Sequence, residues 1–213
     1  MSISTHRLSQ SAIDSLTELI PQLPAVGYSG PLIAAGQRGT LVASFLHPVY
    51  FLGLPAISGR RGLAAATPTG WRALLLDDTA LVAMAELASD EQGHASRCTG
   101  FNYGPFVEQT RAAAEFADEL MAHESQQFEI RALCVPGVLV WALWLKPAAG
   151  DGDLIIPMYP CNQAVAPPAP PPGSLAGVAQ PLPYHALPSA RFLADLEAEA
   201  PKGLQSIKAG TTP

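Results

Sequence analysis

FEIRALCVPGVLVWALWLK, residues 128–146, is the most apolar stretch of the chain and decides the fold class that the sequence predicts. β-Branched and aromatic residues are frequent in it, which is typical of strands. Pro136 and Gly137 divide the stretch and suit the two central positions of a turn. We therefore expect a hairpin. A tight turn would place Val135 opposite Val138, and a looser turn between the same two strands is the alternative.

Both faces of this hairpin are expected to be covered. Alternate residues of a strand point to opposite faces, and one face of the pair, which begins at Phe128, has no polar member. The other face, which begins at Glu129, is also largely apolar. A hairpin that is buried on both sides lies in the interior of a sheet. A membrane span is excluded by length, because only 14 residues separate Arg131 from Lys146 and a spanning helix needs about 20.

Arg131 and Trp144 form a candidate ligand-binding pair in this hairpin. The tight-turn register places them diagonally across the two strands. One interpretation is a cation–π contact at a covered edge of the sheet. The other is a buried arginine that binds an anion beside the indole ring.

The remaining chain predicts an α+β fold, in which a mixed or mainly antiparallel sheet with the hairpin 128–146 at its centre is packed by two or three helices. The expected helices are 11–20, 77 or 78 to 88, and 105–123. The other expected strands are 40–46, 49–52, 71–76 and 153–159. Pro48 allows residues 40–54 to form either two short strands or one bent edge strand. Residues 57–70 and 89–103 are expected to be loops.

The chain divides into one globular domain and a tail. Residues 1–160 are expected to form a single α+β domain, and residues 161–188 a Pro-rich linker or arm. Residues 189–213 are expected to be a short amphipathic helix followed by a frayed end. Phe192, Leu193 and Leu196 lie on one side of that helix. They are the candidate partner-binding residues, and they would fill a groove on another protein or on a sister subunit.

The composition is apolar and weakly charged. Apolar residues make up 48% of the chain and charged residues only 14%. The charged share is well below the usual quarter, which fits a partner surface, an oligomer, or simply an Ala- and Pro-rich genome. The net charge of -6 and the lack of a basic stripe argue against nucleic acid as a ligand.

The location is predicted from the cysteines and the N-terminus. Three widely spaced cysteines suit a reducing compartment, and the N-terminus has no apolar targeting segment. We expect a cytoplasmic protein, and we take its source to be bacterial without a physical argument.

The best nucleophile motif is HASRC, residues 94–98. Arg97 or a nearby histidine would have to lower the pKa of the Cys98 thiol to make it reactive. His94 and His123 are the candidate bases. No third group that would orient a base is evident, so this set is incomplete.

Other site types have weaker support in the sequence. Arg60 and Arg61 lie between glycines and could hold a phosphate or a carboxylate. No zinc-type spacing, phosphate-binding loop or dinucleotide fingerprint occurs in the sequence, so we expect neither a metal nor a cofactor.

The leading functional hypothesis is therefore a non-catalytic cytoplasmic protein that acts by binding another protein or by self-association. The first alternative is a small hydrolase or transferase that uses Cys98. The second alternative is a small-anion-binding module that uses the arginines.

Overall fold

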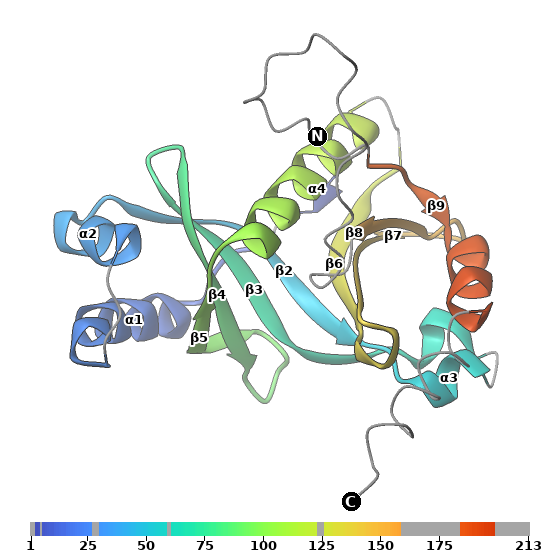
Figure 1. Ribbon diagram of the computed structural model, residues 1–213, viewed down its shortest axis with the longest axis horizontal. Coiled ribbons are helices and arrows are strands. Elements are labelled where there is room, and N and C mark those ends of the chain that lie inside the picture. The colour runs from blue at the N-terminus through green and yellow to red at the C-terminus, as the bar shows by residue number, and fades with distance from the viewer. Residues whose placement is uncertain are drawn as a thin grey trace, which may run out of the picture.

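The structure is a computed structural model that describes residues 3–4, 6–26, 30–58, 61–122, 126–158 and 184–198. Its strands form one mixed sheet of nine strands, with helices on both faces (Figure 1). The strand order is β5-β4-β3-β2-β6-β7-β8-β9, and β1 pairs with β6. The α+β class is confirmed.

The bounds of the elements are as follows. The α-helices are α1 (Gln10–Leu19), α2 (Pro31–Arg38), α3 (Leu54–Ser58) and α4 (Pro105–Met121), and residues 189–198 are also helical. The 3-10 turns are η1 (Ile20–Val26), η2 (Gly62–Ala65) and η3 (Pro136–Val138). The strands are β1 (Ile3–Ser4), β2 (Leu41–Phe51), β3 (Thr67–Asp77), β4 (Ala80–Ser89), β5 (Ala95–Asn102), β6 (Phe128–Val135), β7 (Val140–Pro147), β8 (Leu154–Met158) and β9 (Leu187–Pro188).

The helices divide the core between the two faces of the sheet. Helix α4 crosses one face and packs on both halves of the sheet (Figure 1). On the opposite face, α1 and α2 cover the end made by β2 to β5. Helix α3 and the helix of residues 189–198 cover the end made by β6 to β8. Every central strand is therefore buried on both sides for part of its length.

Strands β6 and β7 pair antiparallel, but the tight turn is wrong. Val135 pairs with Val140 and Arg131 pairs with Trp144, so the register differs by two residues from the tight-turn prediction. Four residues make the connection, and it ends at Leu139 with a left-handed φ of 54°. Because the difference is an even number, the side chains keep their predicted faces. Trp144 is buried and Trp141 is half-buried.

The region after Asp77 differs from its prediction. We expected a helix up to residue 88 and then a polar loop, but the chain forms strands β4 and β5. Asp77 pairs with Ala80 across a two-residue hairpin turn, in which Asp78 has a left-handed φ of 55°. Asp tolerates this conformation, and such turns suit hairpins. Pairing with β3 on one side and β5 on the other overrides the helical propensity of the residues in β4.

Strand β2 is continuous rather than split. Among the described residues, it is flanked by both β3 and β6 only from Val49 to Phe51, and over residues 41–44 it pairs with β3 alone. Pro48 lies within the strand, opposite Trp71 of β3. A bulge between Ser44 and His47 bends the strand, and Phe45 there has a left-handed φ of 50°. The loop predicted over residues 57–70 also gives way to the first part of β3.

The first and fourth helices agree with their predictions. Ser9 caps α1 by accepting a hydrogen bond from the amide of Ala12. Pro105 opens α4, as predicted. Most of the predicted Pro-rich arm lies outside the described residues. Its last residues are described: Tyr184 donates a hydrogen bond to the carbonyl of Gln109, and β9 pairs with β8.

Candidate functional site

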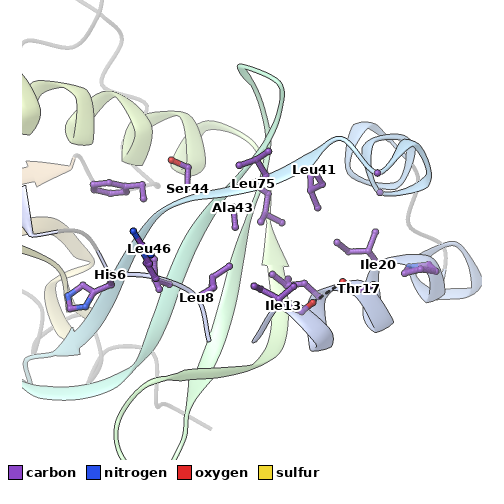
Figure 2. Close-up of a pocket in the computed structure, with 17 residues that line it drawn as sticks. His6, Leu8, Ile13, Thr17, Ile20, Leu41, Ala43, Ser44, Leu46 and Leu75 are labelled. Atoms are coloured by element: carbon purple, nitrogen blue, oxygen red, sulfur yellow. Dashed lines mark hydrogen bonds between the residues drawn. The ribbon is translucent and has the colours of Figure 1, made fainter. Parts of the chain in front are cut away.

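An apolar groove lies between α1, α2 and β2, and we call it the α1–β2 groove. It encloses about 740 Å³. In Figure 2, Ile13, Thr17 and Ile20 on the helical side face Leu41 and Ala43 on the strand side. This volume lies in the range of pockets that bind ligands of drug size or short peptide segments.

The helical wall follows from the spacing of apolar residues in α1. Ile13, Leu16 and Ile20 recur at intervals of three and four and so lie on one side of the helix. Leu16 and Ile20 are buried against the sheet, whereas Ile13 at the rim is 43% exposed. On the other wall, Val42 of β2 is 54% exposed. Two large aliphatic side chains thus face water at the same groove.

The strand wall includes the unpaired edge of β2. Six consecutive residues, 41–46, line the groove, together with Leu75 of β3. Side chains of a strand alternate between faces, so a space that borders residues of both faces extends around the strand edge. The opposite edge of residues 41–44 pairs with β3, and pairing of β2 with β6 begins only at Val49. Among the described residues, no strand pairs with this edge over residues 41–46.

Within the described residues, the polar part of the lining is small and contains no carboxylate. It consists of His6, Arg7, Thr17 and Ser44. His6 lies 3.3 Å from a carboxylate oxygen of Glu129. Hydrogen bonds with His6 and Arg131 hold the pKa of Glu129 below its usual value. Arg7 has no ion-pair partner among the described residues. The groove is therefore apolar with a basic rim, although the chain as a whole is acidic.

A second, smaller cavity of about 280 Å³ lies on the α4 face of the sheet. Arg72 is almost fully buried there, and its guanidinium carbon lies 4.1 Å from the ring centre of Trp141 and 5.1 Å from that of Phe106. Glu86 accepts hydrogen bonds from Arg72 at 2.8 Å and from Asn102 at 2.6 Å. The charge of the arginine is thus matched inside the protein, and the cluster serves to join β3, β4 and α4.

His47 lies opposite Arg72 on the neighbouring strand and is completely buried. Burial lowers the pKa of its imidazole to about 4, so the ring is neutral at pH 7. Its Nδ1 lies 2.8 Å from the carbonyl of Phe45, and its Nε2 has no hydrogen-bond partner among the residues that the structure describes. Neither cavity is lined by His47. A ligand in either cavity would therefore not reach the ring.

The predicted nucleophile is not activated in this structure. Cys98 is buried on β5, facing α1, and burial raises the pKa of its thiol. Its Sγ lies 3.6 Å from the carbonyl oxygen of Gly100. His94 is exposed in the preceding turn, 3.7 Å from a carboxylate oxygen of Asp90. His123 lies outside the described residues. These features disfavour the thiolate that the chemistry needs.

Arg131 and Trp144 do lie together, in a cluster in which a carboxylate balances the charge of the arginine. The guanidinium carbon lies 4.8 Å from the indole ring centre and 4.5 Å from that of Tyr50. Glu129 accepts two hydrogen bonds from Arg131, at 2.9 and 2.5 Å. This arrangement fits the cation–π interpretation, because the charge already has a carboxylate partner. Arg61 is exposed just before η2, and Arg60 lies outside the described residues.

The candidate partner-binding residues of the C-terminal helix pack on their own domain. Phe192 and Leu196 are each 4% exposed and belong to the core cluster beneath α3. Leu193 is half-buried in the same cluster. The structure therefore places no open apolar face on this helix at these three positions.

Sequence reasoning missed the α1–β2 groove. Ile13 falls within the predicted helix 11–20, and Val42 within the predicted strand 40–46. A usable signal was the run of residues 41–46, in which apolar side chains occur at both even and odd positions. Such a run predicts a strand without a polar face, but it does not tell which edge stays open.

Comparisons of the chain with models of protein families, with curated proteins and with solved structures found no match. No helix in the described parts of the chain has the length and apolar character that crossing a membrane requires. Within those same parts, no group of three or more histidine, cysteine, aspartate or glutamate side chains is arranged to hold a metal ion.

Proposed function

We propose that this chain is a non-catalytic binding protein, and that the α1–β2 groove is the surface through which it binds another polypeptide. The single observation that carries the proposal is the groove itself, a hollow of about 740 Å³ with Ile13 and Val42 exposed at its walls. Contiguous exposed apolar surface that is rimmed by polar residues marks interaction sites.

The chemistry of the lining supports binding rather than catalysis. Among the described residues that line it, His6 and Arg7 are the only ionisable ones, and none is a cysteine or a carboxylate. A nucleophile, a base and an orienting group, which acyl or group transfer requires, do not come together there. Cys98 faces the core elsewhere in the fold, with its thiol pKa raised.

A cytoplasmic location is part of this proposal. Cys98 and Cys134, the two cysteines that the structure describes, are both unpaired, as is usual in reducing compartments. Self-association is the alternative form of the same function. In that case the groove would be filled by a segment of a second copy of the chain.

Selection of peptides from a random dodecapeptide display library tests the proposal. Peptides enriched on the wild-type protein are expected to bind the double variant Ile13→Gln and Val42→Lys at least about tenfold more weakly, because each aliphatic group that leaves the interface removes about 1 kcal/mol or more. Leu139→Asn is the matched control. Leu139 is similarly exposed, at 57%, but lies in the β6–β7 connection. Asn tolerates the left-handed φ of this position.

Two results would contradict the proposal. The first is that no peptide is enriched over a surface without the protein. The second is that enriched peptides bind the double variant as tightly as the wild type. Circular dichroism and urea unfolding establish that both variants are folded. Light scattering of the wild type and the double variant tests the self-association form, which predicts a larger mass for the wild type alone.

A further inference from the structure

We infer that the partner segment binds in the α1–β2 groove as an added β-strand, which pairs with the open edge of β2 over residues 41–46 and carries an acidic residue toward Arg7. This inference rests on the proposed function and names the partner by its chemistry. The partner is an extended peptide with apolar side chains and at least one carboxylate, from another polypeptide.

The open edge of β2 is the first support. Residues 41–44 use their other edge for β3, and the sheet continues from β2 to β6 only from Val49 onward. Strand β1 pairs with the beginning of β6 instead, at Ile3 and Ser4. The chain then passes through residues 6–8, which also line the groove. The sheet is thus split at this point, and the groove occupies the split.

Backbone groups make this split a site for an extended chain. Along a strand, alternate residues direct their N–H and C=O groups toward each neighbouring strand. Half of the residues in 41–46 therefore direct these groups into the groove. Unpaired strand edges are templates for a further strand, and proteins recognise extended peptides in this way. A helical segment would leave these groups without partners in a groove that is otherwise apolar.

The side chains of an added strand would find apolar contacts on one side. Leu41, Ala43 and Leu46 belong to the core that faces α1, and Ile13 lies across from them. Side chains on that side of the peptide would pack between β2 and α1. Side chains on the other side would lie beside the exposed Val42 and Ser44. An alternating pattern, apolar on one side, fits this geometry.

The positive charge of Arg7 favours an acidic residue in the bound peptide. Arg7 at the rim is exposed and has no ion-pair partner among the described residues, and no carboxylate lines the groove. A peptide carboxylate beside Arg7 would form an ion pair that the protein does not supply from its own described residues. In a chain of net charge -6, this basic rim is the part that attracts an acidic segment.

A strand that is already part of a second folded copy does not fit. Besides β2, the groove is lined by residues 6–8 and by α1. A strand within another sheet would bring its own neighbouring strands against these walls. Only a segment free of its own sheet can enter, which favours a terminus or linker of the partner.

N-methylation of a selected peptide tests the strand geometry. The probe is the tightest dodecapeptide from the display selection described above, synthesised with one backbone N-methyl group at a time. We expect methylation at alternate positions to weaken binding at least tenfold and methylation between them to be tolerated, because only alternate N–H groups point to β2. Amide hydrogen exchange of residues 41–46 should slow at alternate positions when the peptide is added.

Arg7→Gln tests the charge. The variant should bind the acidic peptide about fivefold or more weakly than the wild type does. It should bind the same peptide with its carboxylate replaced by an amide as tightly as the wild type does. Some peptides could depend on Ile13 and Val42 for binding and yet show no two-residue period in the effects of N-methylation or in hydrogen exchange. That result would overturn the added-strand geometry and leave the proposed function standing. Equal effects of Arg7→Gln on the acidic and amide peptides would overturn the charge assignment. Failure to select any groove-dependent peptide would overturn the proposed function itself.

Discussion

His47 should make the protein less stable in acid. Burial lowers the pKa of its imidazole from 6.5 to about 4, with smaller contributions from Arg72 and His6 in the same direction and an opposing one from the Phe45 carbonyl. The folded state therefore keeps the ring neutral down to about pH 4, whereas the unfolded chain takes up a proton below pH 6.5. As the pH falls through this window, proton uptake favours the unfolded state, and stability is lost.

The size of the effect follows from these two pKa values. At pH 5 the unfolded state gains about 2 kcal/mol relative to pH 7 from the protonation of His47 alone. In His47→Asn, the side-chain amide can still donate to the carbonyl of Phe45 but does not titrate. The variant should lose stability at pH 7 because it leaves a small void, by about 1–2 kcal/mol.

Urea unfolding at pH 7 and pH 5 measures the effect as a difference. The wild type should lose about 2 kcal/mol more than His47→Asn between the two pH values. Carboxylates such as Glu129 contribute equally to the pH dependence of stability in both proteins. The difference between the two proteins therefore reports the protonation of His47 alone. His94→Asn, at an exposed histidine, is the control and should behave as the wild type does. An equal loss in the wild type and His47→Asn would refute the argument that burial keeps this imidazole neutral.

Three further predictions concern packing, charge and reactivity. At Gly70, a new Cβ would lie 2.7 Å from the backbone carbonyl oxygen of Leu87, which cannot move aside, whereas at Gly100 it would meet nothing within 4 Å. Gly70→Ala should therefore destabilise the fold by about 1–3 kcal/mol, and Gly100→Ala much less. Chemical denaturation of the two variants measures this difference. Arg72→Leu should lower the free energy of unfolding by about 2–3 kcal/mol, because it leaves the half-buried carboxylate of Glu86 without its arginine partner. Arg111→Leu, which removes an exposed ion pair, should lower it by less than about 1 kcal/mol in the same assay. Cys98 should react with iodoacetamide at pH 7.5 much more slowly in the folded than in the urea-unfolded protein, as followed by peptide mass spectrometry; equal rates would contradict its burial and raised pKa.

Local signals in the sequence were sufficient for α1 and α4. A capping serine, an apolar stripe at intervals of three and four, and a proline at the first helical position act within one or two turns of chain. The observed bounds, Gln10–Leu19 and Pro105–Met121, lie within two residues of the predicted ones. The α+β class followed from the same kind of local pattern.

The strands were harder to predict from the sequence, because the segments that pair with one another lie far apart in the chain. Residues 80–89 are helix formers by propensity, and they became β4 because β3 and β5 offer hydrogen bonds on both sides. Of the two predicted turns, the structure has the looser one, with a four-residue connection between β6 and β7. Gly137 in this connection packs against Leu54 of α3, at a distance that leaves no room for a Cβ, and a contact between such distant residues follows from no local rule. Sequence pattern therefore predicted the faces of β6 and β7 but not their register.

The sequence by itself determined the class of fold, two of its helices, and an apolar, weakly charged composition. Only the tertiary structure decided where an open apolar groove lies. The α1–β2 groove exists because β1 takes the place beside β6 that β2 would otherwise occupy, so one edge of β2 stays open beside α1. Which strand edge is left unpaired depends on the pairing of the whole sheet, and that choice is settled by contacts between distant segments.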